Sequence, residues 1–375
     1  MIHYIGVNDK NIDLFEGQYK VKNGISYNSY LIESDKTAIM DTVDISFKDE
    51  WLCNIKKVLK DKKLDYLVIL HMEPDHSACI SALLEEYPDV TIVTNAKAYK
   101  MILQFFPEII IKNYLEIKDN DKLSLGEYEL NFIFAPMVHW PEVMLAYEAN
   151  NKILFSADAF GKFGSLDTFE PWLDEARRYY IGIVGKYGAF VQKLFAKIKD
   201  VQINAIYPLH GPILNENLGY YLDLYNKWSS YTPEDDGVLI AYASIYGNTK
   251  EAALKLSKNL GEYNHEIVDL ARCDIHGSIA KAFKYSKLVI ASPTYNGGLF
   301  PIVKFFIDGL VEREYQNRII ATIDNGTWGP MTSKAIMKNF ESSKNISFLN
   351  PVILKSSINT NSILELEKLA NELKK

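Results

Sequence analysis

The chain has 375 residues and a formal net charge of -7, with 48% hydrophobic and 24% charged residues. This composition is typical of a soluble globular protein, and the length predicts about two domains. The acidic balance, without any long block of Lys or Arg, argues against nucleic acid or an anionic membrane as the main partner. No stretch is long enough to span a bilayer and the N-terminus lacks a signal-peptide pattern, so we expect a cytoplasmic protein.

The three cysteines, Cys53, Cys79 and Cys273, are an odd number without C-x-x-C spacing. They therefore encode neither a disulfide framework nor a rubredoxin-type iron site. Cys79 fits the apolar face of a helix with Ile80 and Leu83, so we expect it in the core.

The first part of the chain contains many strand-like runs with helices between them, such as Phe47 to Lys60 and Glu170 to Ile198. This pattern predicts two sheets flanked by helices. One apolar run ends in His71-Met72-Glu73-Pro74-Asp75-His76, which gathers two imidazoles and two carboxylates. Side chains alternate along an extended chain, and a turn at Pro74 can bring His76 round to a second ion. The motif predicts a metal site, and a binuclear one.

Three further candidate ligands, His139, Asp158 and His210, each end an apolar strand-like run. Four of the seven histidines lie at such strand ends, whereas His3, His265 and His276 do not. A single strand-end histidine is usually an ordinary half-exposed residue that makes a hydrogen bond. Four of them in company with three carboxylates favour metal binding.

The ligand order His-x-Glu-x-Asp-His, then His, Asp and His, resembles the metallo-β-lactamase superfamily. Glu73 stands where that superfamily usually has His, and this departure is the signature of the flavodiiron proteins, also called A-type flavoproteins. The resemblance implies two irons bridged by Asp158 and by an oxo or hydroxo group. It implies that one iron is bound by His71, Glu73 and His139, and the other by Asp75, His76 and His210. An added carboxylate suits iron or manganese better than zinc.

The polar segment Tyr231 to Gly237, with one Pro and one Gly, is the best linker candidate. We therefore expect domains at 1–235 and 236–375. The expected fold class is α/β. It combines an N-terminal αββα metallo-β-lactamase-like sandwich with a C-terminal flavodoxin-like, doubly wound, five-stranded parallel sheet.

The second domain alternates strands and helices. The expected strands are Val238–Ala243, His265–Leu270, Leu288–Ala291, Arg318–Ile323 and Val352–Leu354. The expected helices are Thr249–Leu260, Ile279–Tyr285, Pro301–Leu310, Met331–Phe340 and Leu364–Lys374.

Three loops at the strand ends carry the ligand prediction for this domain. The first, Ser244 to Thr249, offers hydroxyls, an amide and free N–H groups at a helix start, which suits a phosphate. Alone it would read as a helix cap. With the loops 292–298 and 324–330 it resembles flavodoxin, which implies FMN. Tyr295 and Trp328 are candidates to pack against the flavin ring, although both could be ordinary exposed aromatics. The expected FMN contacts are Ser244, Tyr246, Gly247, Asn248, Thr249, Pro293, Thr294, Tyr295, Asn296, Gly297, Asn325, Gly326 and Trp328.

A reduced flavin and a ferrous pair together hold four electrons, the number that takes O2 to two waters, and two electrons suffice to couple two NO into N2O. The resemblance therefore implies an oxygen reductase, a nitric oxide reductase or both. Tyr187 is the candidate for donating a hydrogen bond to the bound substrate. Trp140 is expected either to shield the pocket or to belong to the core.

The resemblance also implies a head-to-tail homodimer or a dimer of dimers. The chain ends soon after the fifth unit, so electrons are expected from a separate rubredoxin, flavin reductase or reduced deazaflavin. Two alternatives remain open: a binuclear zinc hydrolase with a flavodoxin-like domain, and an electron-transfer or redox-sensing protein with a structural metal.

Overall fold

The computed structural model describes all residues from 1 to 375. The chain forms two compact units, Met1–Asn226 and Lys227–Lys375. Helix α7 (Leu218–Ser229) spans their junction, and the first strand of the second unit, β16, begins at Asp235. The expected division between residues 235 and 236 stays a prediction. No helix has the length and apolar character needed to cross a membrane.

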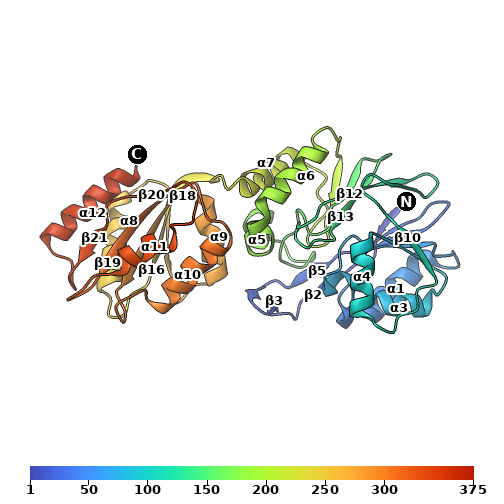
Figure 1. Ribbon diagram of the computed structural model, residues 1–375, viewed down its shortest axis with the longest axis horizontal. Coiled ribbons are helices and arrows are strands. Elements are labelled where there is room, and N and C mark those ends of the chain that lie inside the picture. The colour runs from blue at the N-terminus through green and yellow to red at the C-terminus, as the bar shows by residue number, and fades with distance from the viewer. The chain divides into compact units, whose positions relative to one another are not determined.

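The first unit contains a six-stranded sheet in which β7 to β10 are parallel and β1, β6 and β7 are antiparallel neighbours. The strand order is β1 (Ile2–Tyr4), β6 (Tyr30–Ile32), β7 (Ala38–Met40), β8 (Tyr66–Val68), β9 (Thr91–Thr94) and β10 (Asn113–Glu116). Helices α1 (Lys48–Leu59), α3 (Ile80–Glu86) and α4 (Ala96–Phe105) lie beside it in Figure 1. Helix α1 buries Trp51, Ile55 and Leu59, which share one face because they are four residues apart.

The second sheet of this unit follows the chain order and is antiparallel as far as β14, with β14 and β15 parallel. Its strands are β11 (Lys122–Ser124), β12 (Glu129–Phe134), β13 (Met144–Glu148), β14 (Ile153–Phe155) and β15 (Ala205–Tyr207). Two short ribbons pair β2 (Val7–Asp9) with β5 (Ile25–Tyr27) and β3 (Leu14–Phe15) with β4 (Tyr19–Lys20). This unit also contains two short helices, η1 (Ile45–Phe47) and α2 (Pro74–Ser77).

The segment expected as one helix from Glu170 to Ile198 is interrupted. Helix α5 (Trp172–Tyr179) passes into a π-helical turn, η2 (Tyr180–Val184), and a 3-10 turn, η3 (Gly185–Tyr187), before α6 (Gly188–Ile198) begins. Gly182 lies in the break because the Tyr19 ring occupies the space of a Cβ, which would be 2.8 Å from Tyr19 Cε1. The Tyr19 hydroxyl donates to the Gly182 carbonyl at 2.9 Å. A contact from a distant part of the chain thus fixes the interruption.

The second unit is a parallel sheet with strands in the order β17-β16-β18-β19-β20, and β21 also pairs with β19. The strands are β16 (Asp235–Tyr242), β17 (His265–Asp269), β18 (Tyr285–Pro293), β19 (Arg318–Asn325), β20 (Ile346–Phe348) and β21 (Val352–Leu354). The expected fifth strand is therefore present, but it is preceded by a second short segment on the same side of β19. Pro351 lies between the two segments and has no N–H to donate to a ladder.

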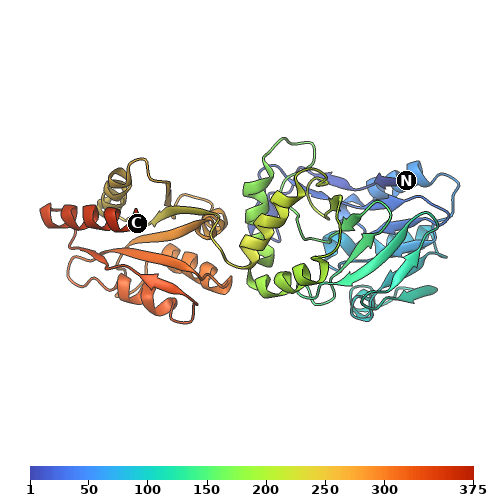
Figure 2. The same cartoon turned by 90° about the horizontal axis from the view of Figure 1, so that it is seen from above.

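Four helices connect these strands and a fifth follows the last strand. The connecting helices are α8 (Asn248–Leu260), α9 (Ile275–Lys284), α10 (Pro301–Glu312) and α11 (Thr332–Asn339), and the last helix is α12 (Thr360–Leu373). Helices α9 and α12 begin four residues earlier than expected, because polar caps extend them. Asp274 accepts a hydrogen bond from the His276 N–H, and Asn359 forms a capping box with Ser362. Figure 2 shows helices on both faces of the sheet, which confirms the doubly wound arrangement.

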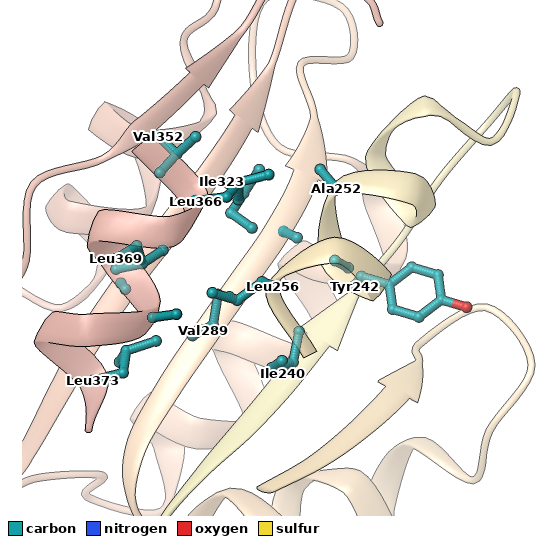
Figure 3. Close-up of a cluster of buried hydrophobic side chains, with 14 of the residues drawn as sticks. Ile240, Tyr242, Ala252, Leu256, Val289, Ile323, Val352, Leu366, Leu369 and Leu373 are labelled. Carbon is teal, nitrogen blue, oxygen red and sulfur yellow. The ribbon is translucent and has the colours of Figure 1, made fainter. Parts of the chain in front are cut away.

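The core on one face of this sheet lies beneath α8 and α12. Ala252, Leu256 and Leu260 of α8 meet Leu366 and Leu369 of α12 over the central strands, as Figure 3 shows for most of the cluster. The apolar residues of both helices recur at three- and four-residue spacing, so each helix buries a single stripe. This packing holds the carboxyl ends of β16, β18 and β19 at one edge of the sheet.

Candidate functional site

The seven predicted metal ligands follow strands of the first unit. His71 and Glu73 come after β8, Asp75 and His76 lie in α2, and the others lie in the loops after β12, β14 and β15. The fold brings them together in two groups. One consists of His71, Glu73, His139 and Asp158, and the other of Asp75, His76 and His210. Within each group the candidate ligand atoms lie within 4.8 Å of one another.

Asp158 lies between the two groups and is fully buried. Its Oδ2 atom is 3.2 Å from His71 Nε2 and 3.1 Å from His139 Nε2. Its Oδ1 atom is 3.2 Å from His76 Nε2 and 3.7 Å from His210 Nε2. One carboxylate therefore presents a different oxygen to each group, which is the arrangement needed to bridge two cations.

The second group fits a cation closely. His76 Nε2 and His210 Nε2 are 3.0 Å apart, and each is 3.3 Å from Asp75 Oδ2. Two nitrogens that bind one ion at about 2.1 Å and at a right angle are themselves about 3.0 Å apart. Both carboxylate oxygens of Asp75 and Oδ1 of Asp158 are buried without a hydrogen-bond partner. Such atoms are costly unless a cation satisfies them, so these residues fit a metal pair.

Hydrogen bonds on the outer side of two histidines fix which ring nitrogen faces the cluster. His210 Nδ1–H donates to the Ser26 carbonyl at 2.7 Å, and His71 Nδ1–H donates to Glu142 Oε1 at 2.9 Å. The Nε2 atom of each ring therefore faces the cluster and is the atom that would bind a cation. Glu142 Oε1 also accepts the Met72 N–H at 2.9 Å. The sequence analysis missed Glu142, because nothing in its local sequence distinguishes it.

Asp41 holds the backbone at Leu70 and His71. It lies at the end of β7 and is fully buried, and its Oδ1 atom accepts the N–H groups of Leu70 at 2.7 Å and His71 at 3.2 Å. Burial raises its pKa to about 8. Asp41, Met137 and Ala157 all have positive φ angles, of 53°, 66° and 49°. Such strained positions are uncommon outside glycine and gather at functional sites.

Charged groups of the cluster shift one another's pKa values. Burial would raise the pKa of Asp158, but the His71 charge and hydrogen bonds from His139 and His71 hold it well below its usual value. Burial would lower the pKa of His139, but its hydrogen bonds to Asp158 and Glu73 raise it to about 9. Asp158 therefore remains ionised at neutral pH.

Aromatic rings surround the cluster. The Trp140 ring centre is 5.3 Å from that of His71, and the Tyr179 ring centre is 5.3 Å from that of His210. Tyr187 lies at the start of α6 with its ring 6.4 Å from that of Phe190, and it makes no hydrogen bond or ring contact with the seven side chains. The role expected for Tyr187 stays a prediction. Burial and the charges of the cluster carboxylates raise the pKa of Tyr179, which the sequence analysis did not single out.

The predicted flavin loops of the second unit surround a cavity of about 490 Å³, a size typical of ligand pockets. Of the expected contacts, all except Gly247 and Tyr295 line it. Four further residues line it as well: Ile245, Thr327, Gly329 and Ser356. Ser356 follows β21, so a fourth loop contributes to this cavity. No sequence motif predicted this contribution.

The loop after β16 is built to receive an anion. Gly247 caps the thirteen-residue helix α8 with φ of 99°, a conformation that favours glycine, and its N–H donates to Ser244 Oγ at 3.1 Å. No Lys or Arg lines the cavity, so the neutral donors available to an anion are backbone N–H groups at the α8 terminus and side chains such as that of Thr249. Trp328 and Tyr246 are 95% and 92% exposed, and Tyr295 is 42% exposed, so flat aromatic surface is available beside the cavity.

The two sites define a class of protein in which a metal-binding domain is joined to a flavodoxin-like domain. The ODP family beta lactamase matches residues 25–211, and the flavodoxin domain matches residues 239–345. The chain is 30% identical over 355 residues to a nitric oxide reductase of Moorella thermoacetica, covering 92% of this chain and 88% of that protein.

Two solved structures are similar to this chain over its whole length. The rubredoxin oxygen:oxidoreductase of the anaerobe Desulfovibrio gigas has a TM-score of 0.91 and 26% identity, with 100% of this chain and 96% of that chain covered. The flavodiiron protein from Giardia intestinalis has a TM-score of 0.88 and 22% identity, covering 100% and 94%, and this likeness concerns the fold.

The chain belongs to the flavodiiron protein family. The predicted family, the fold class and the oxidoreductase class are thereby confirmed, with FMN and a di-iron site as the cofactors. The zinc hydrolase alternative is not favoured.

Proposed function

We propose that this chain reduces O2, NO or both at a pair of irons that receives electrons through FMN. The observation that carries the proposal is the position of Asp158, whose two oxygens face two separate groups of histidine and carboxylate ligands. A hydrolase would use the same fold with zinc, but the Glu73 carboxylate favours the harder, redox-active cation. The names of two similar proteins, a nitric oxide reductase and a rubredoxin oxygen:oxidoreductase, support the two substrates.

In the proposed assignment His71, Glu73 and His139 hold one iron, and Asp75, His76 and His210 hold the other. Asp158 would bridge them. When bound and reduced, the two irons and the flavin would supply four electrons, and the three carboxylates would offset most of the charge of a ferrous pair. The protein fixes the ligands from outside, through Glu142 on His71 and Ser26 on His210. Trp140, whose ring lies beside that of His71, is proposed to shield one side of the cluster.

FMN is proposed to lie in the cavity of the second unit, with its phosphate at the start of α8. Thr249 and the backbone of the α8 terminus receive the phosphate, and Trp328 and Tyr295 offer aromatic surface to the ring. The flavin contacts remain those expected from the sequence, and Ser356 is added to them. The proposed domain division stays at residues 235 and 236.

The electron donor is proposed to be a separate carrier, and a rubredoxin is the first candidate because the Desulfovibrio protein carries that name. A flavin reductase and reduced deazaflavin are the alternatives. We further propose a head-to-tail homodimer or a dimer of dimers, and a cytoplasmic location. Sedimentation of the purified protein and cell fractionation test these two points.

The test is anaerobic purification followed by metal and flavin analysis, then stopped-flow mixing of the reduced protein with O2 and with NO. The proposal predicts two irons and one FMN per chain, and rapid flavin reoxidation by at least one gas. Two zincs with esterase or phosphodiesterase activity would support the hydrolase. A reduced protein that passes electrons to a partner but consumes neither gas would support the redox carrier.

A further inference from the structure

The last two residues of β19, Asp324 and Asn325, hold the loops of the proposed flavin site together. Asp324 is 1% exposed, and it is not among the residues that line the cavity. Its Oδ1 atom accepts the Thr294 hydroxyl at 3.0 Å, and its Oδ2 atom accepts the Ser333 N–H at 3.0 Å. One buried carboxylate thus joins the loop after β18 to the start of α11.

The Thr294 hydroxyl extends this connection. It accepts the N–H groups of Met331 at 2.9 Å and Thr332 at 3.3 Å while it donates to Asp324, and it also lies 3.2 Å from the Thr332 hydroxyl. A hydroxyl has one proton and two lone pairs, so these bonds use its whole capacity. Thr294 lines the cavity, yet its hydroxyl is committed to the neighbouring loop and has no proton left for a ligand.

Asn325 makes a second connection on the opposite side. Its Oδ1 atom accepts the Ser356 N–H at 3.1 Å, and its Nδ2 group donates to the Ser356 carbonyl at 2.9 Å. The loop after β21 is therefore attached to β19 as the loop after β18 is. The Asp324 bonds differ in one respect, because their acceptor is a carboxylate, which makes stronger hydrogen bonds than a neutral group.

We propose that Asp324 is a positioning residue for FMN: it fixes the loop after β18 against the loop after β19, and so sets flavin affinity and potential without touching the flavin. This inference rests on the proposed FMN site. Without Asp324 the Thr294 hydroxyl and the Ser333 N–H lose their buried acceptor, and the two ring-flanking loops can move apart. The flavin would then meet a cavity that must be organised on binding.

The test compares Asp324→Ala with a matched pair of isosteric variants. Thr294→Val removes the hydroxyl that binds Asp324. Thr322→Val removes a hydroxyl two positions earlier on β19, which bonds Ser333 Oγ at 2.8 Å and so also joins β19 to α11. Full-length protein is stripped of flavin, FMN affinity is measured by quenching of flavin fluorescence, and the midpoint potentials of the bound flavin are measured by redox titration.

We expect Asp324→Ala and Thr294→Val to weaken FMN binding about tenfold, which corresponds to about 1.4 kcal/mol, and to shift the flavin potentials. Thr322→Val should lower the thermal midpoint while its FMN affinity stays within about twofold of the wild type, because its bond does not reach the loop after β18. If Asp324→Ala fails to fold, the inference is tested by comparing the FMN affinity and flavin potentials of Thr294→Val with those of Thr322→Val.

Unchanged affinity and potentials in Asp324→Ala or, if that variant does not fold, in Thr294→Val would overturn the inference. So would an equal loss of affinity in Thr322→Val, because the effect would then be general destabilisation. A wild-type protein that takes up no FMN would instead contradict the proposed function itself.

Discussion

Glu142 gives the sharpest test of how the protein holds its metal ligands. The variant Glu142→Gln keeps an oxygen that can accept from His71 Nδ1–H and Met72 N–H, but removes the negative charge. Charge-assisted hydrogen bonds are about twice as strong as neutral ones, so each bond loses about 1 kcal/mol. The loss at Met72 reduces folding stability by about that amount. The loss at His71 should appear as an iron affinity about tenfold lower, at the lower end of the effects seen for such outer partners.

Glu142→Leu should be more severe, because two buried donors then lose their acceptor at about 1–3 kcal/mol each. A control is Glu148, the last residue of β13, the strand that begins two residues after Glu142. It is also fully buried and accepts the N–H groups of Asn150 at 2.9 Å and Asn151 at 2.7 Å. Glu148→Gln should cost at least as much free energy of unfolding, because Glu148 accepts through both oxygens and the amide keeps only one of them, but it should not release iron.

The assay is competition for iron with a chelator, monitored by metal analysis, alongside thermal unfolding of each variant. The reasoning is refuted if Glu142→Gln retains iron as tightly as the wild type. It is equally refuted if Glu148→Gln loses iron to the same extent, since the effect would then follow stability and not the orientation of His71.

Three further outcomes are expected. Asp158→Asn should abolish gas reduction and release iron while FMN stays bound, as metal and flavin analysis of the purified variant would establish. Thr249→Val should loosen FMN with both irons retained, and loss of both cofactors in either variant would count against separate sites. Tyr187→Phe tests the hydroxyl expected to assist the substrate, and Tyr179→Phe is its comparison. Because Tyr179 packs beside His210 and Tyr187 does not, we expect the larger fall in turnover for Tyr179→Phe, and the reverse order would support the role predicted for Tyr187.

The convergence of the seven candidate ligands could be predicted from the sequence because each follows a strand, and strand ends can be recognised from apolar runs. His139, Asp158 and His210 are far apart in the chain, but parallel and antiparallel strands deliver them to one edge of the sandwich. The partners behind the ligands could not be predicted. Glu142 and Asp41 act through contacts with His71 across separations of 71 and 30 residues, and neither lies in a recognisable motif.

Local breaks in regular structure escaped prediction for the same reason. The interruption at Gly182 depends on the ring of Tyr19, which lies 163 residues earlier. Ser356 reaches the flavin cavity only because β21 runs parallel to β19, and its short polar loop resembles any other. Helix starts at Asp274 and Asn359, in contrast, carried readable caps and could have been placed four residues earlier from sequence alone.

The central claim is that seven side chains hold two irons with Asp158 between them. Anomalous diffraction from anaerobically grown crystals, recorded on both sides of the iron edge, tests it directly. The account predicts two iron peaks about 3.5–4 Å apart, one on each side of the Asp158 carboxylate. A single peak, a signal at the zinc edge in place of iron, or ligand side chains that point away from one another would contradict it.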